Sequence, residues 1–445
     1  MRAATLKPAS ALGSLLVAGM GAALLTLALA LLLAGDGGGR STRPAAVPAD
    51  PYAATNEELA FWETRVARDP ADFVASNRLA SAYIQRGRET GDVSDYSRAQ
   101  AAVDASLSAL PGDNAGAYAL LATLQNVRHE FAAAAETARL ALEIDPSQEF
   151  VYATLGDAQL GLGLYDEAFG SYVALSKKAP GLAAFSRLAH AYELRGELAE
   201  AKSAWENALS TDGGRNAEAT AWANTQFGTF YFTQGDLDGA AARYDAALDA
   251  FPGYIHALAG QARLAAATGD SDTAIDLYTQ VTERQPLPEY VAELGDVYAA
   301  GGQTAAAEEQ YALVEAIRQL YIANGIDTDL QLAVFLADHD LRPGDALQAA
   351  LAVYNRTPDS IYAADSVAWA LVKAGRAEDA VPYAEQALRL GTPDARLWYH
   401  SGMVSAATGD LTTAREHLER ALEINPHFSP LQAPVARQTL EELDA

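Results

Sequence analysis

The chain has 445 residues, no cysteine and a formal net charge of −27 at neutral pH. The lack of cysteine excludes disulfides, thiol catalysis, Cys-ligated zinc and the acylated cysteine of a lipoprotein. Because phosphate binding needs a basic footprint, the acidic excess argues against nucleic acid as a partner. It favours a cationic protein or peptide, or else simply keeps a helical surface soluble.

An apolar segment comes first along the chain. Between Pro8 and Gly35 there is no charged residue, and residues 9–34 are mostly Ala, Leu, Gly and Val. A helix needs about 20 such residues to cross a bilayer, so we expect a transmembrane anchor at 9–34 after a short tail at 1–8. The alternative is a cleaved signal peptide with a small-x-small site at 28–30, although the apolar run continues beyond that site.

Residues 35–54 are rich in Gly, Pro and Ala and predict a flexible linker. Arg2 and Lys7 precede the apolar segment, whereas Arg40 and Arg43 follow it, so the positive-inside rule only slightly favours a cytoplasmic N-terminus. We expect a single-pass membrane protein whose remaining chain lies outside the cytoplasm. The alternative is secretion after signal cleavage.

From about residue 73 to 426, alanine, glycine and proline recur at fixed offsets about every 34 residues. Ala168 has counterparts in nine further frames. Five residues before these alanines, seven of the ten frames carry glycine: Gly163, Gly196, Gly235, Gly269, Gly302, Gly375 and Gly409. Twelve residues after them, seven carry proline: Pro111, Pro146, Pro180, Pro252, Pro286, Pro358 and Pro426. Because two uncommon residues keep one register, composition alone cannot explain the pattern.

One unit, residues 149–180, shows what this punctuation does. Gly163 ends a first helix, because the residue after a helix often adopts a left-handed conformation that glycine tolerates best. Pro180 ends the second helix, because it lacks an N–H group and clashes with the preceding turn. The small residues Gly156 and Ala168 allow the two helix axes to approach closely. The unit is therefore a scaffold element rather than a catalytic motif.

The same residues resemble the tetratricopeptide repeat (TPR), whose motif places residues where this unit has Tyr152, Leu155, Gly156, Gly163, Ala168, Tyr172 and Pro180. The resemblance covers about 70–430 and is to TPR proteins of the bacterial membrane-anchored or exported type. It implies an all-α, right-handed superhelical solenoid of about ten helix-turn-helix repeats over 55–445. It also implies binding of other proteins.

Both ends of the repeat array are expected to carry single helices as caps. Residues 55–70 are interpreted as a half repeat, with Trp62 at the aromatic position and Pro70 as the stop. A capping helix is expected at about 433–444. The first full unit carries an insertion at 88–94.

The middle of the array departs from the pattern. The unit at 327–358 is the weakest, with Leu341 in place of the turn glycine. Just before it, residues 304–324 contain no helix breaker. They predict an elongated helix that makes a joint between an N-terminal and a C-terminal block.

No catalytic motif stands out, and we expect neither enzyme activity nor a cofactor or metal. The best metal candidate is the run Asp338, His339 and Asp340, but adjacent residues on a helix point in different directions. A helix end exposed to water is the preferred interpretation. No P-loop, dinucleotide-binding glycine motif or nucleophile elbow is present.

The resemblance implies a concave binding face lined by positions 2, 5, 9 and 12 of each first helix, which share one helical face. The candidate partner-binding residues are Asn77, Asn126, Asp157, His190, Trp222, Phe232, His256, Arg263, Asp296, Tyr362, Asp365, Trp369 and Tyr399. The aromatic members either anchor a partner or pack between neighbouring units. The Lys and Asn array that clamps a peptide carboxylate in some TPR proteins is missing.

These observations predict a membrane-tethered, non-catalytic scaffold that binds a protein or peptide in its concave groove. An exported peptide- or glycan-binding protein is the alternative.

Overall fold

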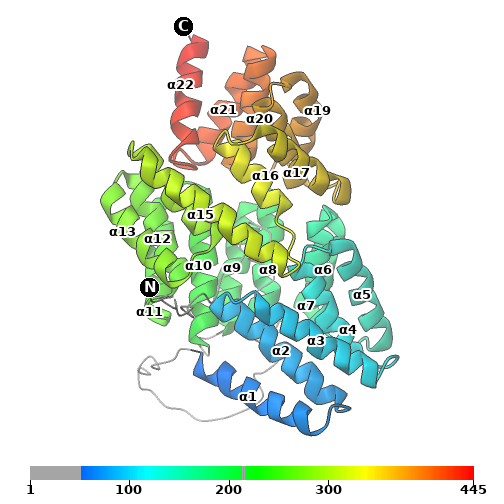
Figure 1. Cartoon of the computed structure of the whole chain (residues 1–445). Coiled ribbons are helices and arrows are strands. Elements are labelled where there is room, and N and C mark those ends of the chain that lie inside the picture. The colour runs from blue at the N-terminus through cyan, green and yellow to red at the C-terminus, as the bar shows by residue number, and fades with distance from the viewer. Residues whose placement is uncertain (1–51, 213, 215, 445) are drawn as a thin grey trace, which may run out of the picture.

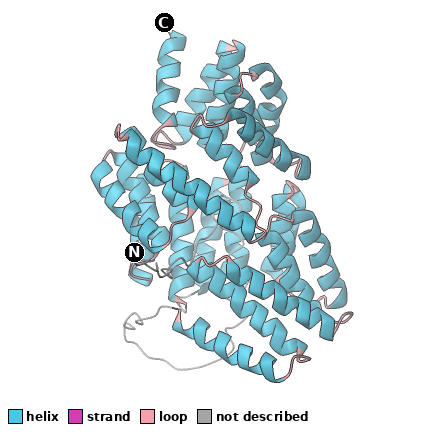
Figure 2. Cartoon of the chain, viewed as in Figure 1, coloured by secondary structure: helices cyan, strands magenta, loops and turns pink. Residues whose placement is uncertain are grey.

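The structure is a computed structural model that describes residues 52–212, 214 and 216–444, and its regular elements there are all helices (Figure 2). Their bounds are α1 (Ala53–Arg68), α2 (Phe73–Thr90), α3 (Ser94–Ala109), α4 (Ala115–Val127), α5 (Phe131–Ile144), α6 (Val151–Gly161), α7 (Tyr165–Lys178), α8 (Leu182–Leu194), α9 (Leu198–Asp212), α10 (Ala217–Thr233), α11 (Leu237–Ala250), α12 (Ile255–Thr268), α13 (Ser271–Arg284), α14 (Pro288–Ala300), α15 (Thr304–Ala323), α16 (Asp329–Asp338), α17 (Pro343–Arg356), α18 (Ile361–Lys373), α19 (Ala377–Ala387), α20 (Ala395–Thr408), α21 (Leu411–Ile424) and α22 (Gln432–Asp444). The expectation of an all-α repeat fold is confirmed for this part of the chain.

The expected tail at 1–8, anchor at 9–34 and most of the linker at 35–54 lie outside the described residues. Among the helices of 52–444 that are described, none combines the length and the apolar character that a membrane span requires.

The pair α6 and α7 forms in the way its sequence predicts. Gly163 has a φ of +81°, which places the left-handed turn directly after α6. Ala168 and Tyr172 are fully buried on α7, and a Cβ atom on Gly156 would overlap the Tyr172 ring. The close approach of the two helices therefore depends on the small residue in the first and the aromatic residue in the second.

Ten such pairs follow one another from α2–α3 to α20–α21 (Figure 1). In most of them the first helix also contacts the first helix of the next pair, so the first helices form the inner side of the stack. From α4 to α20, exposed residues of the first helices occur only at helix ends: Ala217, Thr268, Ala300 and Ala407. The second helices, in contrast, expose one side along their length. The inner face of the stack is thus largely covered.

Two irregular regions match their predictions in outline. The elongated helix expected at 304–324 is α15, which is 20 residues long. In the weak unit that follows, Asp340 and Arg342 have positive φ angles at the turn that glycine makes elsewhere.

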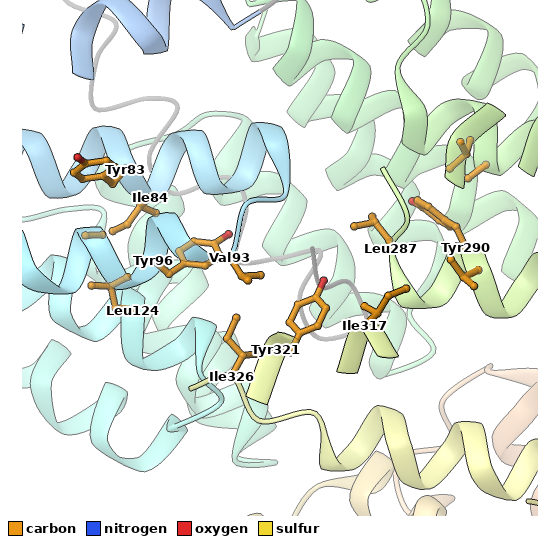
Figure 3. Close-up of a cluster of buried hydrophobic side chains, with 14 of the residues drawn as sticks. Tyr83, Ile84, Val93, Tyr96, Leu124, Leu287, Tyr290, Ile317, Tyr321 and Ile326 are labelled. Atoms are coloured by element: carbon orange, nitrogen blue, oxygen red, sulfur yellow. The ribbon is translucent and has the colours of Figure 1, made fainter. Parts of the chain in front are cut away.

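The stack winds back onto itself. Figure 1 shows α16–α22 lying above α6–α10, so that turns of early units meet loops of later ones. At the lower end, one apolar cluster joins Val93, Tyr96 and Leu124 to Tyr321 and Ile326 (Figure 3). We call this line of contacts between early turns and later loops the seam.

Candidate binding face

The predicted binding residues lie on the first helices, where the structure places most of them in contact with the neighbouring first helix. Asp157 of α6 shows the arrangement most clearly. Arg187 of α8 donates to both of its carboxylate oxygens, each at 2.8 Å, and the Tyr172 hydroxyl donates to it at 3.0 Å. Arg187 is fully buried. Burial opposes its charge, yet the Asp157 carboxylate raises the pKa of Arg187.

A second polar group joins α16, α18 and α20. The His400 Nδ1 atom lies 2.9 Å from Asp365, and the Asp338 carboxylate accepts from Trp369 Nε1 at 2.8 Å and from Gln432 Nε2 at 2.7 Å. The Trp369 and His400 rings stack with centroids 4.5 Å apart. Burial opposes a charged ring here, but the Asp365 and Asp338 carboxylates raise the pKa of His400 to about 9.

Two further groups occupy equivalent places. His339 Nε2 and the Tyr311 hydroxyl both contact Asp296 Oδ1, at 2.7 and 2.9 Å. Arg263 donates to Glu293 at 2.6 Å, and Glu293 also accepts from the Tyr278 hydroxyl. Each group ties one helix pair to the next.

The remaining polar candidates follow the same rule. Asn77 donates to Asn114 at 2.9 Å, Asn126 donates to the Thr154 carbonyl at 2.8 Å, and His256 lies 2.6 Å from the Tyr290 hydroxyl. His190 instead contacts Glu193 on its own helix, at 3.4 Å. We call this set of pairings along the first helices the inner row. It holds the repeats together from inside the stack.

Most of the aromatic candidates are buried against other helices and are not exposed on a surface. Trp222, Phe232, Trp369 and Tyr399 are 6%, 5%, 2% and 3% exposed, and Tyr362 is half-buried. Trp222 lies against Trp205 of the preceding unit, with ring centroids 6.3 Å apart. Trp369 lies against Tyr399 and His400 of the next first helix, α20. Of the two alternatives left open by the sequence, these rings therefore have the contacts expected of packing between units.

The run Asp338, His339 and Asp340 is not simply a helix end exposed to water, as the sequence suggested. Asp338 and His339 are partly buried and bind different partners, whereas Asp340 is exposed and pairs with Lys373 at 2.7 Å. The three side chains therefore diverge. Within the described residues no group of His, Asp and Glu side chains could hold a metal ion.

Sequence reasoning did not predict the Asp157–Arg187 and Arg263–Glu293 pairs or the glycine contacts at the seam. Arg187 follows Asp157 by 30 residues, and Glu293 follows Arg263 by 30. Opposite charges on successive first helices, 30 residues apart, were a signal that could have predicted both pairs.

The better-formed cavities of the described residues lie at the seam. One of about 260 Å³ is open to solvent and lined by the turn at 163–167, Asp359, Arg389 and Leu390. Another of about 20 Å³ lies between Arg88 and Glu89 on one side and Tyr254, Arg284 and Gln285 on the other. The smaller one has room for about one water molecule.

Comparison with known proteins agrees with the repeat geometry. Models of the tetratricopeptide repeat match residues 231–294 and 368–427, which span α10–α14 and α18–α21. Over these residues the chain is built of tetratricopeptide repeats. No curated protein matches it significantly.

Several solved structures resemble parts of the chain. One is PilF of Pseudomonas aeruginosa, with 22% identity, coverage of 49% of this chain and 93% of that chain, and a TM-score of 0.35. A chain of the APC/C hetero-tetramer Cut9–Hcn1 has 14% identity, coverage of 88% and 94%, and a TM-score of 0.39. YrrB, a TPR protein with an unusual peptide-binding site, has 20% identity, coverage of 41% and 92%, and a TM-score of 0.28. At these TM-scores the likenesses carry no argument about function.

Proposed function

We propose that the protein is a non-catalytic interaction scaffold, tethered to a membrane by residues 9–34, that binds a protein or peptide on the inner face of its repeats. The observation that carries the proposal is the uninterrupted series of helix pairs from α2 to α21. Outside these pairs, no described segment is long enough to form a catalytic domain. Solenoids of this kind offer extended surfaces to partners.

The charge of the chain supports a cationic partner. Residues 1–50 contain four basic and two acidic residues, so the remaining chain carries a net charge of −29. A field of this sign attracts basic proteins and repels nucleic acid.

Photocrosslinking in living cells tests the binding face. A photoreactive phenylalanine derivative replaces His190 or Tyr362, which are half-buried candidate binding residues of first helices, or Phe61, an exposed aromatic residue of α1. We expect both first-helix positions to crosslink the same protein, identified by mass spectrometry, and Phe61 not to do so. Crosslinks from Phe61 alone would place the binding surface elsewhere, and no crosslink from any position would contradict the scaffold proposal.

A further inference from the structure

The seam runs in register through five successive units. The turns after α2, α4, α6, α8 and α10 face the loops before α14, α16, α18, α20 and α22, in that order. From one row to the next, the contacting turn moves forward by one repeat, and the loop that it contacts also moves forward by one repeat. An accidental contact between two distant loops would not reproduce itself five times.

The middle row of the seam is the closest contact. A Cβ atom on Gly163 would overlap the backbone of Asp359 and Ser360. In the same row the Ile361 backbone N–H donates to the Tyr165 hydroxyl at 3.0 Å. Arg389 also donates to the Asp359 carbonyl at 2.6 Å and reaches the Gly163 carbonyl at 3.3 Å. At Gly163 the turn thus leaves no space for a side chain.

The next two rows repeat this arrangement with other residues. The Thr392 hydroxyl donates to the Leu194 carbonyl at 2.7 Å, and Asn425 Nδ2 donates to the Phe232 carbonyl at 2.8 Å. Both side chains are buried, and both accepting carbonyls lie at the C-terminal ends of first helices. The Phe232 carbonyl also accepts from the Gly235 backbone N–H at 2.9 Å, so Asn425 adds a second hydrogen bond there.

An apolar cluster lies beside these hydrogen bonds in the seam. Tyr165 and Leu194 from the lower side pack with Ile361 and Leu397 from the upper side, and all four are buried. The turn glycines of the upper units, in contrast, do not pack against another part of the chain. A Cβ atom on Gly302, Gly375 or Gly409 would have no neighbour within 4 Å. Close packing is thus confined to the turns that lie on the seam.

We propose that the seam is a clasp, along which the two turns of the stack separate while each helix pair stays folded, and that the inner face becomes accessible only when the clasp is open. The inner face is covered in the closed form. Polar hydrogen bonds with one small apolar cluster hold the middle row of the seam and the two rows after it, whereas the large apolar cluster of Figure 3 holds the first two rows and broad apolar faces hold the helix pairs. The three rows without the large cluster are the weaker contact and open first. This inference rests on the proposed function in taking the inner face as the binding surface.

Thiol labelling of the full-length chain in its membrane tests the clasp, because the natural sequence contains no cysteine. Three buried positions serve as single reporters: Thr392→Cys at the seam, Ser186→Cys on the inner side of α8, and Ala141→Cys in the core of the α4–α5 pair. Each reporter is combined with Gly163→Ala or with Gly269→Ala. Both glycines have a positive φ, +81° and +85°, but only Gly163 touches the opposite turn, so Gly269→Ala is the matched control for backbone strain.

We expect Gly163→Ala to accelerate maleimide labelling of Thr392→Cys and Ser186→Cys by at least about tenfold and to leave labelling of Ala141→Cys unchanged. We expect Gly269→Ala to change none of the three labelling rates.

If labelling of Ser186→Cys stays slow, or if Gly269→Ala acts as strongly as Gly163→Ala, the clasp is wrong. If Ala141→Cys also accelerates in Gly163→Ala, that variant has unfolded, and Tyr165→Phe, which removes only the hydroxyl bound to Ile361, decides by the same criteria. No partner takes part, so a negative result overturns the clasp and leaves the crosslinking test of the scaffold unaffected.

Discussion

At the scale of single residues, polar side chains that were expected to bind a partner instead form contacts between repeats along the inner row. Asp157 was predicted on this face from the TPR resemblance, which implies that positions 2, 5, 9 and 12 of each first helix line it, and Asp157 lies on the first helix α6. Its partner Arg187 was not predicted, because spacing within one helix says nothing about how closely the next first helix approaches. For Trp222 and Trp369 the sequence left two alternatives open, anchoring a partner or packing between units, because spacing within one helix does not decide between them.

The Asp157–Arg187 pair gives a direct prediction. Replacing Arg187 by Met leaves a buried carboxylate without a counter-ion, so we expect a loss of about 3–5 kcal/mol in unfolding free energy. The double variant with Asp157→Leu should recover most of this loss. Urea unfolding followed by circular dichroism measures both. A double variant as unstable as the sum of its single changes would argue against a paired role.

Trp369 lies between Asp338 and His400 and is 2% exposed. Truncation to alanine removes a large buried ring, so we expect a loss of about 3–5 kcal/mol. Phe61→Ala on the exposed side of α1 is the control and should change stability by less than about 0.5 kcal/mol. A melting temperature of Trp369→Ala close to that of the natural protein would restore the alternative that this ring is free to anchor a partner.

His400 makes stability depend on pH. Burial opposes the charged ring, but Asp365 and Asp338 raise the pKa of His400 to about 9, against about 6.5 in an unfolded chain. The stabilisation is therefore complete below about pH 6.5 and is lost as pH rises through about 9. The stability difference between the natural protein and His400→Gln should shrink by on the order of 2 kcal/mol between about pH 6 and pH 9.5. A difference that stays constant, or grows, over this range would mean that the ring is neutral.

At the scale of elements, glycine and proline punctuation predicted helix boundaries well. Helix α7 spans Tyr165–Lys178, between Gly163 and Pro180, as the repeat pattern indicates. The turn between α16 and α17 was harder to predict, because Asp340 and Arg342 have positive φ angles without a glycine, and arginine rarely adopts this conformation.

The last helix, α22, should stabilise only its neighbours. It covers α20 and α21 with partly buried Leu440 and Leu443, and Gln432 binds Asp338. A chain ending at Pro430 should lose about 2 kcal/mol of hydrogen-exchange protection in α20 and α21 and none in α4–α7. Equal loss in both regions would contradict nearest-neighbour coupling.

At the scale of the whole molecule, the sequence could predict the stack but not the seam. Whether distant turns meet depends on small rotations accumulated over several units, and no single residue encodes that sum. The glycine at 163 carries the same signal as the glycine at 269, yet only the first contacts another turn.

The membrane tether is a prediction about the whole chain. We expect the full-length protein to stay with membranes through carbonate and high-salt washing, and a chain beginning at Ala45 to remain in the supernatant, because residues 9–34 supply about the 20 apolar residues that a span needs. N-terminal sequencing is the second readout. A mature form beginning near residues 31–37 would show a cleaved signal peptide and would favour the exported alternative.

The most direct test of the architecture is small-angle X-ray scattering from the chain that begins at Ala45. Two turns packed against each other along the seam should give a radius of gyration close to that of a compact domain of this length, about 21 Å, and at most a few ångströms more. A radius above about 30 Å, with the long distances of an extended solenoid, would show that the repeats do not close on themselves in solution.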